Sequence, residues 1–182
     1  MNHRAMILLP SLAVIACGDG FGDGLTEFER EFTAQVTGTW SYSASVPATH
    51  HTSDNLQCEI AGVSITVGNP TEKVGAVNVG IFQFDAQASG GTLGCTGDGI
   101  EDFQQDLATT PVETVLAPFG GLEFDFTHST PLGEMRFENR APTLPESHSP
   151  PVGISANSWS GHVSLSIPSG TRSVGHFTTV RR

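Results

Sequence analysis

From Val36 onward, apolar and polar residues alternate along much of the chain with a period of two. Successive side chains of a β-strand point to opposite faces of its sheet, so this alternation predicts strands with one buried face. In 38–46, Trp40 and Tyr42 alternate with serines, which predicts an apolar inner face and a hydroxyl-rich outer face. The pattern is equally regular in 61–68, 122–128 and 159–167.

Weaker alternation predicts further strands at 77–88, 91–97, 112–117, 133–138 and 174–180. In the first of them the apolar parity switches between Ile81 and Phe82, which predicts a β-bulge or a bend at that point. Glycine and proline residues separate the segments, as they do at turns. The longest interruption, 140–158, is rich in proline and predicts an irregular loop.

A short helix is predicted before the first strand. Thr26 and Glu29 have the spacing of a capping box, and the apolar residues of 25–32 recur on one helical face. The preceding residues, 17–24, are rich in glycine and show no apolar period, so we expect them to form a flexible tether. The folded domain is therefore expected to comprise 25–182.

Eight or nine short strands with little helix predict an all-β domain, most simply a single antiparallel β-barrel, with a β-sandwich as the alternative. The barrel is favoured by Gly38-Thr39-Trp40, which follows the predicted helix directly. This tripeptide resembles the entry to lipocalin barrels, where a Gly-x-Trp tryptophan packs across the closed base. The lipocalin Thr-Asp-Tyr motif is absent from the chain.

The lipocalin resemblance implies a structural role for Trp40 and ligand contacts from aromatic residues that face into the barrel. Four phenylalanines are candidates for this lining, namely Phe84, Phe124, Phe126 and Phe137. The alternative is that they fill the core, because an eight-stranded barrel is just wide enough for its own side chains.

Residues 1–16 have the features of a secretory signal, with Arg4 followed by an apolar run of only about ten residues, too short to span a bilayer. Val-Ile-Ala-Cys at 14–17 resembles the lipobox of bacterial lipoproteins. The resemblance implies cleavage before Cys17 and lipid attachment to it, and two or more acyl chains give stable membrane anchoring. Gly18 after the cysteine implies sorting to the outer rather than the inner membrane, with the domain in the periplasm or at the cell surface.

The remaining chain is strongly acidic. The full sequence has a formal charge of −11, and loss of Arg4 would make it −12. Nucleic acids and anionic lipid surfaces require clusters of Lys and Arg, so they are not expected as partners. Cys58 and Cys95 are the two cysteines that remain once Cys17 is lipidated, and in an exported protein we expect them to form a disulfide.

No metal or cofactor is predicted. The histidines lack the spacing of common metal motifs, although His162 and His176 lie on neighbouring predicted strands and are the pair expected to meet. The acidic residues of 98–106 do not match a calcium-loop pattern. Nucleophile motifs such as Gly-x-Ser-x-Gly are also missing, so we expect no enzymatic activity.

The sequence therefore predicts a non-catalytic interaction or structural module of the cell envelope, anchored through lipid on Cys17. Its expected partner is another envelope protein. The alternative is a lipocalin-like carrier of a small apolar molecule.

Overall fold

The computed structural model describes residues 27–47, 55–74, 81–117, 121–142, 153–155, 157–170 and 172–182. The predicted signal, Cys17 and the tether lie outside these residues, as does Thr26 of the predicted capping box. The short helix is confirmed as α1 (Glu27–Ala34). The strands are β1 (Gly38–Val46), β2 (Gln57–Val74), β3 (Ile81–Ser89), β4 (Thr92–Thr96), β5 (Phe103–Asp106), β6 (Thr110–Ala117), β7 (Gly121–Thr130), β8 (Gly133–Ala141), β9 (Gly153–Ile154), β10 (Ser158–Ser166) and β11 (Arg172–Arg181).

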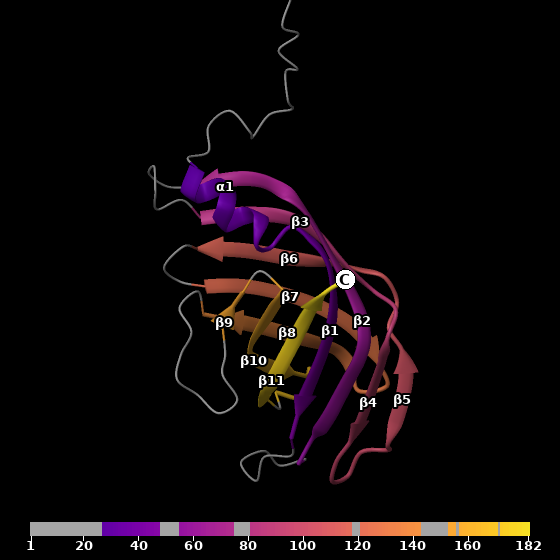
Figure 1. The fold of residues 1–182 in the computed structure, drawn as a ribbon. Helices are drawn as coiled ribbons and strands as arrows, with labels where there is room; N and C mark the ends of the chain where they lie inside the picture. Colours follow the sequence, from indigo (N-terminus) through magenta and orange to yellow (C-terminus); the bar gives the residue numbers. More distant parts are fainter. Residues whose placement is uncertain are drawn as a thin grey trace, which may run out of the picture.

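Eight strands form a closed antiparallel barrel, shown in Figure 1. Around the ring they follow the order β1, β2, β3, β6, β7, β8, β10 and β11, and β1 closes the ring by pairing with both β2 and β11. The barrel is therefore confirmed, and the sandwich alternative is wrong. Apart from the closing pair of β1 and β11, neighbouring strands of the ring follow one another along the chain, with only β4, β5 and β9 interposed.

The strands β4 and β5 lie outside the ring. The long strand β2 pairs with β4 through its first residues and with β3 through its later ones, so β4 continues the line of β3 along β2. Gly90 and Gly91 join these two strands with positive φ angles. A Cβ on Gly91 would lie 2.6 Å from the carbonyl oxygen of Ala61, so only glycine fits this crossing point.

The disulfide between Cys58 and Cys95 is confirmed. The two residues are direct partners in the pairing of β2 with β4, and their Cα atoms lie 4.2 Å apart. Both side chains are buried. The disulfide therefore fastens the two outer strands to the barrel.

Some local expectations differ from the structure. Pairing is continuous across Ile81 and Phe82, and the register shifts lie instead in β2, between Val67 and Glu72. Ile81 is exposed, so its side chain points outward, and treating it as an inward-facing apolar residue was wrong. The strand β5 was not predicted, because its four residues, FQQD, show no apolar alternation.

The barrel interior is filled mainly by aromatic and branched side chains. Trp40 and Trp159 lie against each other near one end, with ring centroids 3.9 Å apart. Tyr42 lies among Phe124, Phe126 and Phe177, with centroid distances of 5.8 to 5.9 Å. Pairs of aromatic rings at such distances add stability beyond the area that they bury.

Candidate functional site

The four phenylalanines predicted as ligand lining are all buried. Phe126 and Phe137 stack with ring centroids 4.9 Å apart, and Phe124 meets Phe177 edge to face at 5.0 Å. Phe84 lies on β3, and its side chain is only 5% exposed. The side chains of Phe124, Phe126 and Phe137 are therefore occupied by contacts with other aromatic rings of the barrel.

One end of the barrel is covered by α1 (Figure 1). The indole Nε1 of Trp40 donates a hydrogen bond of 2.8 Å to the carbonyl of Val36, directly after the helix. The guanidinium of Arg181, at the end of β11, lies 4.4 Å from the Trp40 ring centroid and donates to the carbonyls of Ala34 and Thr37. Trp40 thus joins the helix, the first strand and the last strand, which agrees with a structural role.

A second attachment of α1 is the ion pair between Glu29 and Lys73. Their charged atoms lie 2.6 Å apart, and the Glu29 side chain is fully buried. Lys73 lies near the end of β2, so the helix is tied to both β2 and β11. A buried carboxylate needs such a partner, because removing an isolated charge from water is costly.

The opposite end of the barrel is covered by the segment after β5. Leu107 is buried, and its backbone N–H donates a 3.0 Å hydrogen bond to the carbonyl of Gly91. A narrow space between Leu107, Val63 and Phe126 has no room for a water molecule. The described residues thus cover both ends of the barrel.

The larger hollows lined by described residues open on the outer surface. One of about 450 Å³ lies over β2, β4 and β5, beside Glu59 and Phe103. Two others, of about 460 and 350 Å³, lie over β2, β3 and β6 and over β6, β7 and β8, and both include Pro111. None of these three hollows is enclosed, as a carrier's apolar cavity would be.

Tyr42 makes a hydrogen bond inside the barrel. Its hydroxyl donates a 2.9 Å hydrogen bond to Oδ1 of Asn139, whose Nδ2 donates to the carbonyl of Phe124 at 2.9 Å. Burial raises the pKa of the Tyr42 hydroxyl. Both side chains therefore act as structural partners of each other and of β7.

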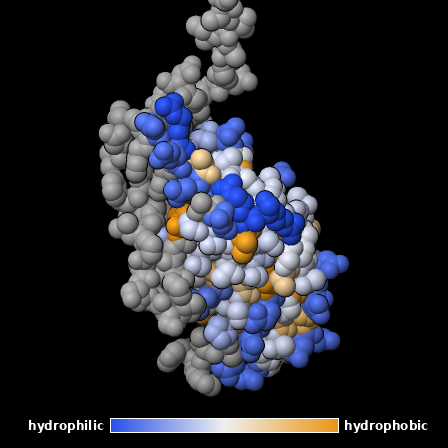
Figure 2. Space-filling model, viewed as in Figure 1, coloured by the Kyte–Doolittle hydropathy of each residue, from blue (hydrophilic) through white to orange (hydrophobic). Residues whose placement is uncertain are grey.

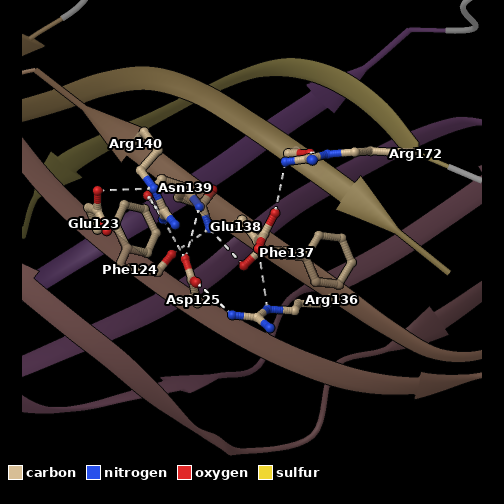
Figure 3. A network of polar contacts seen from close by, with 10 residues as sticks. Glu123, Phe124, Asp125, Arg136, Phe137, Glu138, Asn139, Arg140 and Arg172 are labelled. Carbon is tan, nitrogen blue, oxygen red and sulfur yellow. Dashed lines mark hydrogen bonds and ion pairs between the residues drawn. The ribbon is translucent and has the colours of Figure 1, made fainter. Parts of the chain in front are cut away.

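A network of charged residues covers the outside of β7 and β8 (Figure 3). Asp125 accepts hydrogen bonds from Arg140 at 2.7 Å and from Arg136 at 3.1 Å. The hydrogen bond and charge of Asp125 raise the pKa of Arg136. Burial lowers the pKa of Arg140, but the same interactions with Asp125 outweigh it and the net shift is upward.

The same network extends to Glu123, which pairs with Arg140 at 3.3 Å, and to Glu138, which pairs with Arg172 of β11 at 3.1 Å. Glu123 and Asp125, which lie two residues apart on one strand, are thus each held by arginine. These ion pairs link neighbouring strands. They do not give the two carboxylates the different environments that a general acid and a general base require.

His162 and His176 meet, as the sequence predicted. They are direct partners in the pairing of β10 with β11, and their ring centroids lie 5.0 Å apart on the outer surface. Among the described residues, no group of three or more His, Cys, Asp or Glu side chains is placed to hold a metal ion. Asp98, from the predicted acidic stretch, is hydrogen-bonded by the side chain of Asn55.

The strands β1, β10 and β11 contain no aspartate or glutamate, although the chain has 19 such residues. We call their outer surface the acid-free face. Its side chains are Ser41, Ser43, Ser45, Ser160, His162, Ser164, Arg172, Val174, His176, Thr178 and Val180. Val174 and Val180 are 52% and 56% exposed, which is unusual among the large hydrophobic residues that the structure describes.

The acid-free face is bordered by a carboxylate on each side, Glu59 of β2 and Glu138 of β8. At one side, Ser45 donates a 2.6 Å hydrogen bond to Glu59 of β2. At the other, Arg172 donates to Ser164 at 2.6 Å and pairs with Glu138 of β8. In the view of Figure 2, pale surface of intermediate hydropathy with scattered hydrophobic spots lies below the hydrophilic helix α1. The polar outer faces of β1 and β10 were each predicted from the sequence, but not that β11 lies between them and joins them into one surface.

None of the described helices is long and apolar enough to cross a membrane. Comparison with protein families, with curated proteins and with solved structures finds no match to the chain.

Proposed function

We propose that the protein is a lipid-anchored, non-catalytic interaction module of the cell envelope. In this proposal Cys17 carries the lipid, and the acid-free face contacts an acidic surface of another envelope protein. The observation that carries the proposal is the absence of carboxylates from three adjacent strands of a chain whose formal charge is −11.

The charge distribution supports an acidic protein partner. Over most of this chain, a second acidic surface would be repelled, because like charges at an interface are unfavourable. The acid-free face is where that repulsion is weakest, and Arg172 gives it a positive group. Val174 and Val180 add apolar area, which desolvation on binding would make favourable.

The hydroxyl groups of the face would supply directional contacts. Ser43 and Thr178 already lie 3.2 Å apart across β1 and β11, so they hold each other in place. Side chains that are ordered before binding lose less conformational entropy when a partner docks.

The competing proposal is a carrier of a small apolar molecule. It requires the barrel interior to open, and Phe124, Phe126 and Phe137 would have to exchange their present ring contacts for contacts with the ligand. Packed interiors resist such opening, because voids forfeit dispersion contacts. The filled interior therefore favours the interaction module.

The anchor is tested by the substitution Cys17→Ser. We expect the variant to lose metabolic labelling with a radioactive fatty acid and to leave the membrane fraction, because no acyl chain can be attached. Continued labelling of the variant would refute the lipid anchor. The matched variant Cys58→Ser should retain the label, since that cysteine forms the disulfide.

The contact surface is tested by photo-crosslinking in cells. A photoreactive residue at Thr178, in the acid-free face, should give one crosslinked species, and the same residue at Gln83 on β3, across the barrel, should not. Adding Val174→Asp to the Thr178 probe should reduce the yield several-fold, and the captured segment should be acidic. Equal yields from the two probes, a yield that Val174→Asp leaves unchanged, or a basic captured segment would refute the proposed surface.

A further inference from the structure

The two histidines of the acid-free face occupy directly opposed positions on adjacent strands. His162 of β10 pairs with His176 of β11 in the antiparallel register, and both side chains are exposed. Side chains at opposed positions leave the sheet on the same side, with their Cβ atoms about 4.5–5.5 Å apart. The backbone therefore presents the two imidazole rings to the same point above the sheet.

The separation of the rings suits a shared metal ion. Two imidazoles that bind one tetrahedral zinc ion at about 2.0–2.1 Å through a nitrogen have ring centres roughly 5 Å apart. The observed centroid distance is 5.0 Å, and the ring planes are tilted by 48°. Tilted rings at this distance can direct one nitrogen each to a common ion by small rotations of the side chains.

The surroundings leave room for a cation. On β8, Arg140 is the partner of His162, and its charge is engaged by Asp125 at 2.7 Å and by Glu123 at 3.3 Å. On β1, Ser45 is the partner of His176. The same-face positions two residues from each histidine are Ser160, Ser164, Val174 and Thr178, so they add no charge beside the pair.

We propose that His162 and His176 together bind one divalent transition-metal ion, of the zinc or nickel type, through one imidazole nitrogen each. Imidazole is a preferred ligand of these ions. The described chain supplies two ligands, so water or a group from a partner completes the coordination. The site lies in the acid-free face, but metal binding is a property of the isolated chain and is measured without the proposed partner.

The test is titration of the full chain in detergent with Zn²⁺ and with Ni²⁺, followed by competition with a chromophoric chelator. We expect one ion per chain, and His162→Ala and His176→Ala should each weaken binding roughly tenfold or more, because each removes one metal bond. The double variant should bind more weakly still, because it has lost both bonds, and a stoichiometry of one ion per chain is the signature of one shared ion. His128→Ala, on β7, should leave the affinity unchanged.

Three results would overturn the proposal. These are unchanged affinity in both single variants, a stoichiometry of two ions per chain of which each single variant keeps one with unchanged affinity, or loss on substitution of His128. His162 and His176 lie on the outer surface, and near-ultraviolet circular dichroism of Trp40 and Trp159 reports whether each variant retains the native fold. A variant with an altered spectrum is replaced by the corresponding His→Gln variant.

Discussion

Replacing Tyr42 with phenylalanine isolates one buried hydrogen bond in the barrel. The ring keeps its edge contacts with Phe124 and Phe126, whose centroids lie 5.8 Å away. Only the hydroxyl that donates to Oδ1 of Asn139 at 2.9 Å is removed. Because that oxygen stays buried and loses its donor, Tyr42→Phe should lower the free energy of unfolding by about 1–3 kcal/mol at neutral pH.

The same substitution has a defined effect on pH dependence. Burial raises the pKa of Tyr42 in the folded protein, while in the unfolded chain it stays near the ordinary value of about 10. The unfolded state alone releases the proton as the pH passes about 10, so the contribution of Tyr42 is complete below that pH and declines above it by roughly 1.4 kcal/mol per unit. Tyr42→Phe lacks this decline, so the difference in the free energy of unfolding between the wild type and the variant should shrink above about pH 10.

Equilibrium unfolding in urea, followed by the fluorescence of Trp40 and Trp159, measures both effects. Tyr42 is the only tyrosine of the chain, so tyrosinate absorbance reports its ionisation directly. As a control, Ser43→Ala on the outer face of the same strand should change the stability by less than about 0.5 kcal/mol. Equal stability of the wild type and Tyr42→Phe at neutral pH, or tyrosinate absorbance in the folded protein near pH 10, would refute the reasoning.

Two other substitutions test how the sheet is held together. Cys58→Ala together with Cys95→Ala should lower the free energy of unfolding by about 3–4 kcal/mol under oxidising conditions, and equal melting temperatures of oxidised and reduced wild type would contradict this. Gly175→Ala should destabilise the barrel by more than about 2 kcal/mol in the same urea assay, because its Cβ would overlap the carbonyl oxygen of Ser45 in β1. Gly94→Ala is the matched control, since its Cβ would meet nothing closer than 3.9 Å, and an equal loss in both variants would show that close packing at Gly175 is not the cause.

The pattern of alternation identified most strands and the residues that face inward. Trp40, Tyr42 and Phe124 were assigned correctly to the core because side-chain direction follows from strand geometry alone. The pairing of Cys58 with Cys95 could also be predicted from the sequence, because two cysteines that remain in an exported protein tend to form a disulfide. The meeting of His162 with His176 followed from the expectation that consecutive strands are neighbours.

Other features depended on how distant segments meet. Neither β5 nor the position of Leu107 over the barrel end could be inferred, because short polar segments acquire their structure from the strands against which they pack. The irregularity expected at Ile81 lies in β2 instead, since register shifts are decided by the pairing of two strands and not by the pattern of one. The contact of Arg181 with Trp40 likewise joins the two ends of the domain.

The sequence by itself thus determined the secondary structure and the inward or outward direction of most side chains, because both follow from local periodicity. Only the tertiary structure decided that the sheet closes through β1 and β11, and closure places three strands without carboxylates side by side. The acid-free face therefore exists only in the folded barrel, since its residues come from 38–46 and 158–181. Surfaces built from both ends of a chain depend on long-range pairing, which no local pattern encodes.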